Sequence, residues 1–259
     1  MRIVPVPCLS DNYAYLMFGD DPRVAWVVDP SEAPPVEAAL AREGATLSGI
    51  LLTHHHPDHT GGAAELVAAR PGLPVYGYDG DRARIDALSR PVAAGETFTG
   101  LGLSMRALHV PGHTTGALAY AIAEGGRDVA VFTGDTMFVA GCGRLFEGTP
   151  AMMATSLEAI AALGPDVKVY VGHEYTQSNL RFAAHVEPSN ADIAAKSAHV
   201  AELRGRGEPT VPSTIADERK TNPFLRCGEP SVRAFAGATD STSVAEVLAV
   251  VRAAKDSFK

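Results

Sequence analysis

The sequence predicts a mixed α/β protein of the α+β type, in which a strand-rich N-terminal domain is followed by a smaller helical domain. Up to His173, short apolar runs bounded by Gly, Pro or Asp alternate with segments of helical spacing. After His173 the strand patterns stop, and helical segments continue between loops that contain proline. We therefore expect one domain at residues 1–174 and a second at residues 175–259.

The expected strands are short, mostly apolar and separated by turn-forming residues. They span residues 3–6, 13–18, 24–28, 50–53, 75–78, 103–109, 117–122, 129–133 and 167–171. Helices are expected at residues 34–43, 62–69, 151–163, 179–185, 191–206 and 243–255. The first helix has Pro34 in its first turn and Gly44 placed to cap its end, which are typical boundary signals.

Composition excludes several classes of protein. Of the 259 residues, 46% are hydrophobic and 20% charged, as in a packed globular protein. No apolar run approaches the roughly 18 residues of a membrane span, and the start lacks the apolar stretch of a signal peptide, so we expect a cytoplasmic protein. The net charge of −8 argues against binding nucleic acid or anionic membranes. The three cysteines form no C-x-x-C pair, which argues against a disulfide framework or a thiolate zinc site.

The segment T-H-H-H-P-D-H, at the end of an expected buried strand, holds four of the nine histidines. Side chains two apart in an extended segment point the same way, so His54 and His56 can bind one ion while His55 points elsewhere. Asp58 and His59, beyond the proline, can reach a second ion. Imidazole and carboxylate ligands suit zinc, iron or manganese. The alternative, an expression tag or a chance surface loop, fits poorly because the segment is internal and follows an apolar strand.

Three further candidate ligands, His113, Asp135 and His173, each follow a glycine just past the end of an expected strand. Loops at one edge of a sheet converge in space, and glycine lets the backbone approach a crowded centre. We therefore expect these three side chains to complete a site for two ions.

The remaining candidates are weaker. His109 lies inside a strand pattern and is expected to be structural, whereas His185 and His199 are expected to face solvent. Cys142 lies between two glycines, but no base is paired with it in the sequence, so we do not expect a cysteine nucleophile.

The H-x-H-x-D-H signature and the later His, Asp and His resemble the metallo-β-lactamase superfamily. That resemblance implies a four-layer αββα sandwich, in which two sheets pack face to face with helices outside. It implies a first metal held by His54, His56 and His113, a second held by Asp58, His59 and His173, and Asp135 bridging both. The best-known zinc β-lactamases have cysteine at the bridging position, which speaks against antibiotic hydrolysis.

Four stretches are similar to the glyoxalase II (hydroxyacylglutathione hydrolase) family: residues 141–149 (GCGRLFEGT), 172–176 (GHEYT), 218–226 (ERKTNPFLR) and 252–258 (RAAKDSF). The resemblance implies that the C-terminal domain helps to bind glutathione, through Arg144, Tyr175, Arg252 and Lys255. Some members have tyrosine where this chain has Phe146, which leaves apolar contact but removes a hydroxyl contact. We therefore expect weaker, not absent, glutathione binding.

The activity implied is hydrolysis of S-(2-hydroxyacyl)glutathione thioesters such as S-D-lactoylglutathione, the last step of methylglyoxal detoxification. The cofactors implied are two divalent ions, with zinc expected and iron or manganese as alternatives. Two such ions would supply a hydroxide near neutral pH, which Asp58 and Asp135 would orient as catalytic residues. A glutathione thiolate leaves without a general acid because a thiol has a pKa near 8.5. We expect a monomer whose partner is this small-molecule substrate.

Other functions remain open at this point. A glutathione persulfide dioxygenase of the same superfamily would use one iron and consume oxygen. A phosphodiesterase or nuclease would need a basic surface, which the acidic charge disfavours. A metal-buffering protein would bind ions without turnover.

Overall fold

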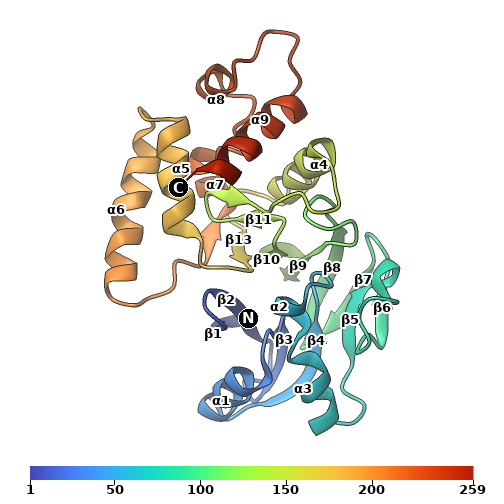
Figure 1. Ribbon diagram of the computed structural model, residues 1–259. Coiled ribbons are helices and arrows are strands. Elements are labelled where there is room, and N and C mark those ends of the chain that lie inside the picture. The colour runs from blue at the N-terminus through green and yellow to red at the C-terminus, as the bar shows by residue number, and fades with distance from the viewer. Residues whose placement is uncertain (259) are drawn as a thin grey trace.

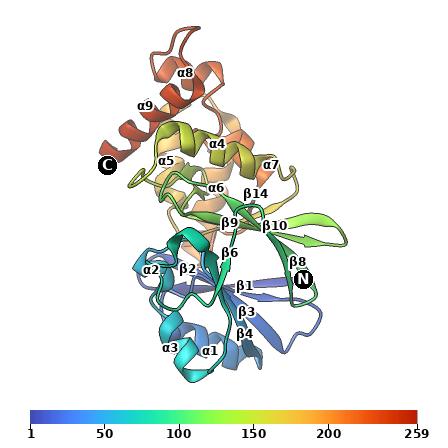
Figure 2. The same cartoon turned by 90° about the vertical axis from the view of Figure 1, so that its right-hand side faces the viewer.

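The computed structural model describes residues 1–258 and contains two six-stranded sheets that face each other (Figures 1 and 2). The first sheet has the order β1 (Arg2–Cys8), β2 (Asn12–Phe18), β3 (Val24–Val28), β4 (Thr46–Leu51), β5 (Val75–Tyr78), β6 (Arg90–Val92). The second has the order β14 (Ser213–Thr214), β13 (Lys168–Val171), β10 (Arg127–Gly134), β9 (Leu118–Glu124), β8 (Leu103–His109), β7 (Thr97–Gly100). A short hairpin pairs β11 (Met137–Phe138) with β12 (Gly141–Cys142).

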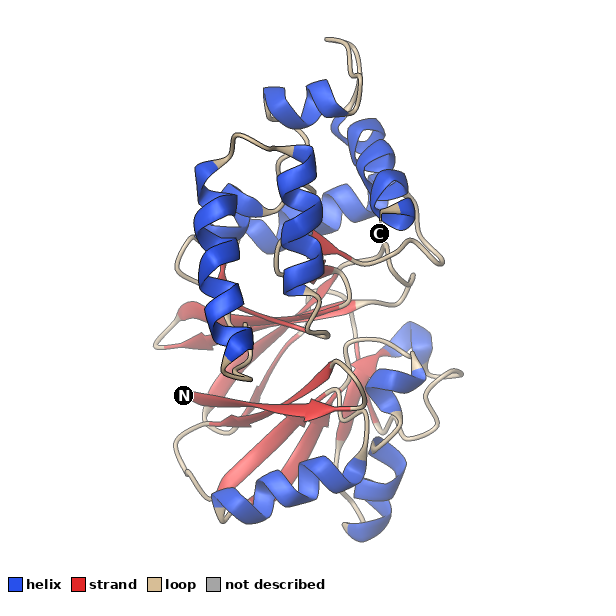
Figure 3. Cartoon of the chain, turned by 60° about the vertical axis from the view of Figure 1, so that its left-hand side comes forward, coloured by secondary structure: helices blue, strands red, loops and turns tan. Residues whose placement is uncertain are grey.

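Helices cover the outer face of each sheet (Figure 3). On the first sheet these are α1 (Ala33–Glu43) and α3 (Ala63–Ala69). Beyond the second sheet lie α4 (Pro150–Ala161), α5 (Thr176–Val186), α6 (Ala191–Gly205), α7 (Ile215–Thr221), α8 (Pro230–Phe235) and α9 (Val244–Ser257). Two single turns, α2 (Pro57–Thr60) and a 3-10 turn (Asp79–Asp81), belong to loops. The predicted αββα arrangement with a helical C-terminal region is confirmed.

Strand β2 shows how the layers are held together. Its odd-numbered side chains, such as Tyr15 and Met17, pack between the two sheets, and its even-numbered ones, such as Leu16 and Phe18, pack toward α1 and α3. Every residue of β2 is buried, because a strand covered on both faces has no polar side. The frame around the ends of the strands is therefore rigidly packed.

The C-terminal helices share the core of the sheets. Val247 and Val251 of α9 belong to the same buried cluster as Met153 and Leu157 of α4 and the strands of the second sheet. Within residues 1–258, no helix is both long and apolar enough to cross a membrane.

Several short elements were not expected from the sequence. Strand β6 contains Pro91, and α7 (IADERKT) has few apolar residues to mark a face. Strand β14 lies after His173, where no strand was expected, and consists of two residues that pair with β13. The two strands form because a neighbouring strand offers backbone partners, which periodicity does not record.

Candidate metal centre and substrate pocket

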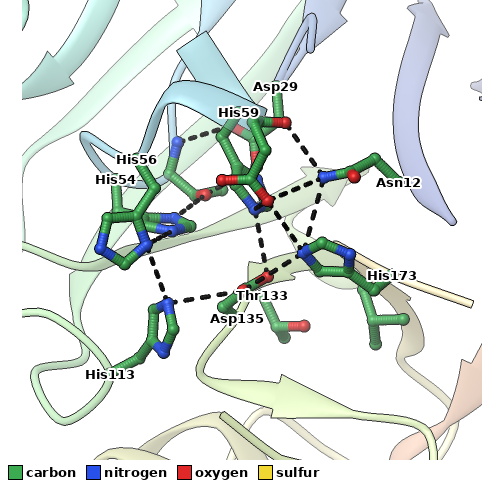
Figure 4. Close-up of polar contacts among 12 residues, drawn as sticks. Asn12, Asp29, His54, His56, His59, His113, Thr133, Asp135 and His173 are labelled. Atoms are coloured by element: carbon green, nitrogen blue, oxygen red, sulfur yellow. Dashed lines mark hydrogen bonds and ion pairs between the residues drawn. The ribbon is translucent and has the colours of Figure 1, made fainter. Parts of the chain in front are cut away.

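All seven predicted ligands meet at one end of the two sheets. Figure 4 labels all of them except Asp58. They come from the segments that follow β4, β8, β10 and β13, so both sheets contribute. The convergence of strand ends predicted from the sequence is what the structure shows.

The first group consists of three imidazoles. His56 Nδ1 lies 3.1 Å from His54 Nε2 and 3.0 Å from His113 Nε2. In two of these rings the nitrogen that points away from the group is hydrogen-bonded. His54 Nδ1–H donates to Thr53 Oγ1 at 3.0 Å, and His113 Nδ1–H donates to the Arg144 carbonyl at 2.9 Å. The inner nitrogens therefore present lone pairs to one another, an arrangement that a cation satisfies.

The second group pairs a carboxylate with two imidazoles. Asp58 Oδ2 lies 3.6 Å from His59 Nε2 and 3.4 Å from His173 Nε2. The outer nitrogens again have partners, since His59 Nδ1–H donates to Asp29 Oδ2 at 2.9 Å and His173 Nδ1–H donates to Asp11 Oδ1 at 2.7 Å.

Asp135 lies between the two groups. Its Oδ2 is 3.4 Å from His113 Nε2 and 3.3 Å from His173 Nε2, and its Oδ1 is 3.3 Å from His59 Nε2. Asp135 Oδ1 and His59 Nε2 are buried without a hydrogen bond. Two orphaned buried atoms and an inward-facing set of nitrogen and oxygen donors fit divalent metal ions.

The protonation states of the first group suit metal binding. Burial lowers the pKa values of His54, His56 and His113, which keeps these imidazoles neutral. Burial also lowers the pKa of His173, but hydrogen bonds to Asp135 and Asp58 outweigh that effect and raise it to about 10. His173 in the second group is therefore a more basic imidazole than the three of the first group.

Glycines make the crowding possible at two of the predicted positions. A Cβ on Gly172 would lie 2.3 Å from Asp135 Oδ1, and a Cβ on Gly134 would lie 2.4 Å from Thr53 Oγ1. Gly134 also has φ of +48°, which disfavours other residues.

The sequence reasoning missed the residues that orient the ligands. Asp29 accepts hydrogen bonds from Thr53 N at 2.8 Å, from Thr53 Oγ1 at 2.6 Å and from His59. Asn12 Nδ2 donates to Asp58 Oδ2 at 3.1 Å. Asp29 carries the same signal as Asp135, a carboxylate directly after a strand, and could have been found by it. Asp11 lies in the turn between β1 and β2, and Asn12 is the first residue of β2, so neither carries such a signal.

A pocket of about 520 Å³ opens beside the predicted metal ligands. Its lining includes five of the predicted ligands and all five residues predicted to bind glutathione, namely Arg144, Phe146, Tyr175, Arg252 and Lys255. The pocket therefore joins a candidate metal centre to a cationic wall.

These five residues differ in how free they are. Phe146 is 63% exposed, with its ring centroid 5.2 Å from that of His113, and the Tyr175 ring stacks on His173 at 4.7 Å. Arg144 is exposed and lies 3.5 Å from Asp256. Lys255 is half-buried, and its Nζ donates to Ser178 Oγ at 3.0 Å. 

Arg252 differs from the other cations because its guanidinium is buried. It donates to the Cys142 carbonyl at 2.7 Å and to Asp256 Oδ1 at 3.1 Å. Its Nε has no partner among the described residues.

The other histidines and the cysteine lie where the sequence placed them. His55 turns away from the ligands, toward Asp81 and Glu147 at 3.6 Å each. His109 contacts the Thr115 carbonyl through Nε2 at 2.8 Å, and His185 and His199 are exposed. Burial raises the pKa of Cys142 to about 11, so it is a thiol and not a thiolate.

Comparison with known proteins agrees with this geometry. Residues 10–173 match the metallo-beta-lactamase superfamily, and residues 174–258 match the hydroxyacylglutathione hydrolase C-terminus. A hydroxyacylglutathione hydrolase from Cupriavidus taiwanensis is 48% identical over 269 aligned residues, covering 100% of both chains. This chain belongs to the hydroxyacylglutathione hydrolase family. The predicted class, a metal-dependent hydrolase, is confirmed by that membership.

Solved structures share the fold. ETHE1 from Myxococcus xanthus superposes with a TM-score of 0.66 at 23% identity, over 97% of this chain and 90% of that chain. TTHA1623, solved in a di-iron-bound form, superposes with a TM-score of 0.59 at 27% identity, over 87% of this chain and 100% of that chain. 

Proposed function

We propose that this hydroxyacylglutathione hydrolase family member hydrolyses S-D-lactoylglutathione and related 2-hydroxyacylglutathione thioesters to glutathione and the 2-hydroxy acid. In this role it completes the detoxification of methylglyoxal. The observation that carries the proposal is one pocket lined both by metal-type ligands and by Arg144 and Lys255. Glutathione has two carboxylates, which these cations can bind while the thioester lies over the ligands.

We propose two metal ions per chain. His54, His56 and His113 would hold one ion, Asp58, His59 and His173 the other, and Asp135 both, which is supported by the grouping of their ligand atoms. Zinc suits this donor set, and so does iron, which TTHA1623 contains as a di-iron centre. When bound, the two ions would supply a hydroxide nucleophile and polarise the thioester carbonyl.

The chain's own residues have three tasks in the reaction. Arg144 and Lys255 bind the peptide carboxylates, and this fixes the distance from the thioester to the ligands. Asp135 and Asp58 orient the attacking oxygen, and Asn12 holds Asp58 through its 3.1 Å hydrogen bond. The departing glutathione thiolate needs no proton donor, because its pKa near 8.5 already makes it a tolerable leaving group.

The deciding experiment measures turnover and metal content on one preparation. Loss of the thioester and release of free thiol are followed with S-D-lactoylglutathione, and with the lactoyl thioester of N-acetylcysteamine as a control. We expect rapid turnover of the first, slow turnover of the second, and two metal ions per chain by elemental analysis. The control has the same thioester but lacks the carboxylates and backbone of the flanking residues.

Different results would point elsewhere. One iron per chain, with oxygen uptake on glutathione persulfide and no thioester turnover, would establish the dioxygenase function instead. Equal turnover of both thioesters would show that the pocket does not recognise glutathione.

A further inference from the structure

Glu147 directly follows Phe146 in the loop that carries Arg144 and Phe146. Its carboxylate accepts two hydrogen bonds from Arg84, at 2.6 Å from Nη2 and 3.2 Å from Nη1. Thr115 donates two more, from its backbone N at 2.8 Å and its Oγ1 at 2.9 Å. The hydrogen bonds from Arg84 and Thr115 lower the pKa of Glu147 to about 2, so the group is ionised at neutral pH.

The same carboxylate also reaches the metal-binding loop. His55 Nε2 lies 3.6 Å from Glu147 Oε1, and His55 Nδ1 accepts from Arg84 Nη1 at 3.3 Å. Arg84 also contacts the buried Asp81 at 3.4 Å. We call Arg84, Glu147, His55, Asp81 and Thr115 the Glu147 cluster. It explains why His55 turns away from the ligands on either side of it.

The loop of residues 144–147 is hydrogen-bonded to both the backbone and the side chain of His113, a predicted metal ligand. The backbone N–H groups of Phe146 and Glu147 donate to the His113 carbonyl at 3.2 and 3.3 Å. The Arg144 carbonyl accepts the Nδ1–H of the His113 ring. A displacement of this loop would therefore move two substrate-binding side chains and also turn the imidazole of His113.

We propose that Glu147, held by Arg84 and Thr115, is a positioning residue that fixes the substrate-binding loop against His113. This inference rests on the proposed function, since it assigns the loop a glutathione-binding role. The guanidinium of Arg84 donates one hydrogen bond to each oxygen of the Glu147 carboxylate, and this fixes the orientation of the carboxylate as well as its distance. Glu147 itself touches neither the substrate pocket nor a ligand nitrogen. It acts through Phe146, Arg144 and His113.

The test uses the metal-loaded protein with E147Q, R84A and the double variant. Affinity for S-methylglutathione, a thioether that cannot be hydrolysed, is measured by calorimetry, and loss of zinc is followed after addition of a chelator. We expect affinity to fall and zinc loss to accelerate by about tenfold in each single variant, as for other residues that orient ligands. The double variant should be no worse than the single ones, because the two residues act as one unit.

R82A is the matched control. Arg82 lies in the same segment as Arg84 but pairs with Asp79 at 3.0 Å on an exposed surface. R82A should behave as the unchanged protein, and R84K should be intermediate, since lysine keeps the charge but loses the fork. A structural role alone would lower the melting temperature and leave thioether affinity unchanged.

The inference is wrong if E147Q and R84A keep both quantities within about twofold of the unchanged protein, or if their effects add in the double variant. A failure of the proposed function looks different, because the unchanged protein would then bind no thioether. The zinc measurement would still decide whether Glu147 positions His113.

Discussion

The Arg252 guanidinium donates a 2.7 Å hydrogen bond to the backbone carbonyl of Cys142, a residue 110 positions earlier in the chain. This contact ties α9 to the hairpin beside the metal ligands. The hydrogen bonds of Arg252 are therefore made within the pocket wall, whereas the less buried Arg144 and Lys255 can offer hydrogen bonds to a ligand. Direct binding of glutathione by Arg252 stays a prediction.

Replacing Lys255 by alanine should raise KM for lactoylglutathione by roughly tenfold, the value of one charge-assisted hydrogen bond. The kcat value should change little, because the lysine binds a part of the substrate remote from the carbonyl. Steady-state kinetics of K255A measure both quantities. K168A is the control, since Lys168 is exposed at the start of β13, away from the pocket. A fall in kcat alone would contradict the binding role.

As the pH is raised, glutathione binding should begin to weaken at a lower pH than the pKa of an ordinary lysine would predict. Burial and the neighbouring arginines lower the pKa of Lys255 from 10.5, so its charge is lost as the pH rises through that lowered value. Calorimetric titration with S-methylglutathione across this range measures the effect. K255R should remove the part of the pH dependence that comes from this residue, because arginine stays charged. An identical profile for both proteins would assign the effect to another group.

Asp135→Ala should abolish thioester turnover and lower the metal content. Among residues 1–258, Asp135 is the one carboxylate that lies within 3.4 Å of imidazole nitrogens in both groups. Elemental analysis and the turnover assay are made on the same preparation, and circular dichroism checks the fold. Turnover equal to that of the unchanged protein would show that the bridging assignment is incorrect.

Asp29→Ala should weaken metal binding although Asp29 is not a predicted ligand. Without Asp29, the His59 ring loses the acceptor of its Nδ1–H. The His54 ring is also held less firmly, because Thr53, its hydrogen-bond partner, is itself held by Asp29. Changes of this kind cost about 10–100-fold in metal affinity. Competition with a coloured chelator measures the affinity. D21A, which removes an exposed carboxylate that pairs with the exposed Arg23, should leave it unchanged.

Glu218→Ala should destabilise the fold. Glu218 is completely buried, accepts from the Ala140 N–H at 2.7 Å and pairs with Lys196 at 2.7 Å. Removing one partner of a buried pair costs about 3–5 kcal/mol in the free energy of unfolding. Denaturant unfolding measures it, with E208A at the exposed Arg206–Glu208 pair as a control of near-zero effect.

The grouping of the residues at the candidate metal centre could be predicted because their signals are local. His54 directly follows an apolar strand, and each of the others lies next to a glycine, a proline or another predicted ligand beyond the end of such a strand. Strand ends converge by the geometry of sheets. The main strands and helices were predicted for the same reason, since burial imposes a period on the sequence. Gly44 does adopt the left-handed conformation that its capping role requires.

Residues whose roles depend on distant partners could not be predicted. Glu147 and Glu218 look like ordinary surface carboxylates until Arg84 and Lys196 are placed beside them. The buried position of Arg252 likewise depends on strand β12, which is far away in the sequence. The domain boundary, the monomeric state and the cytoplasmic location stay predictions.

Strand β14 contributes only two residues, yet it closes an edge of the second sheet. Lys168 and Val169 of β13 pair with Thr214 and Ser213, so β13 has neighbours on both sides. A chain truncated after residue 174 would leave the backbone of β13 open to solvent and strip the apolar cover from α4. Unprotected strand edges recruit other strands, so such a fragment should aggregate instead of folding as an independent lactamase-like unit.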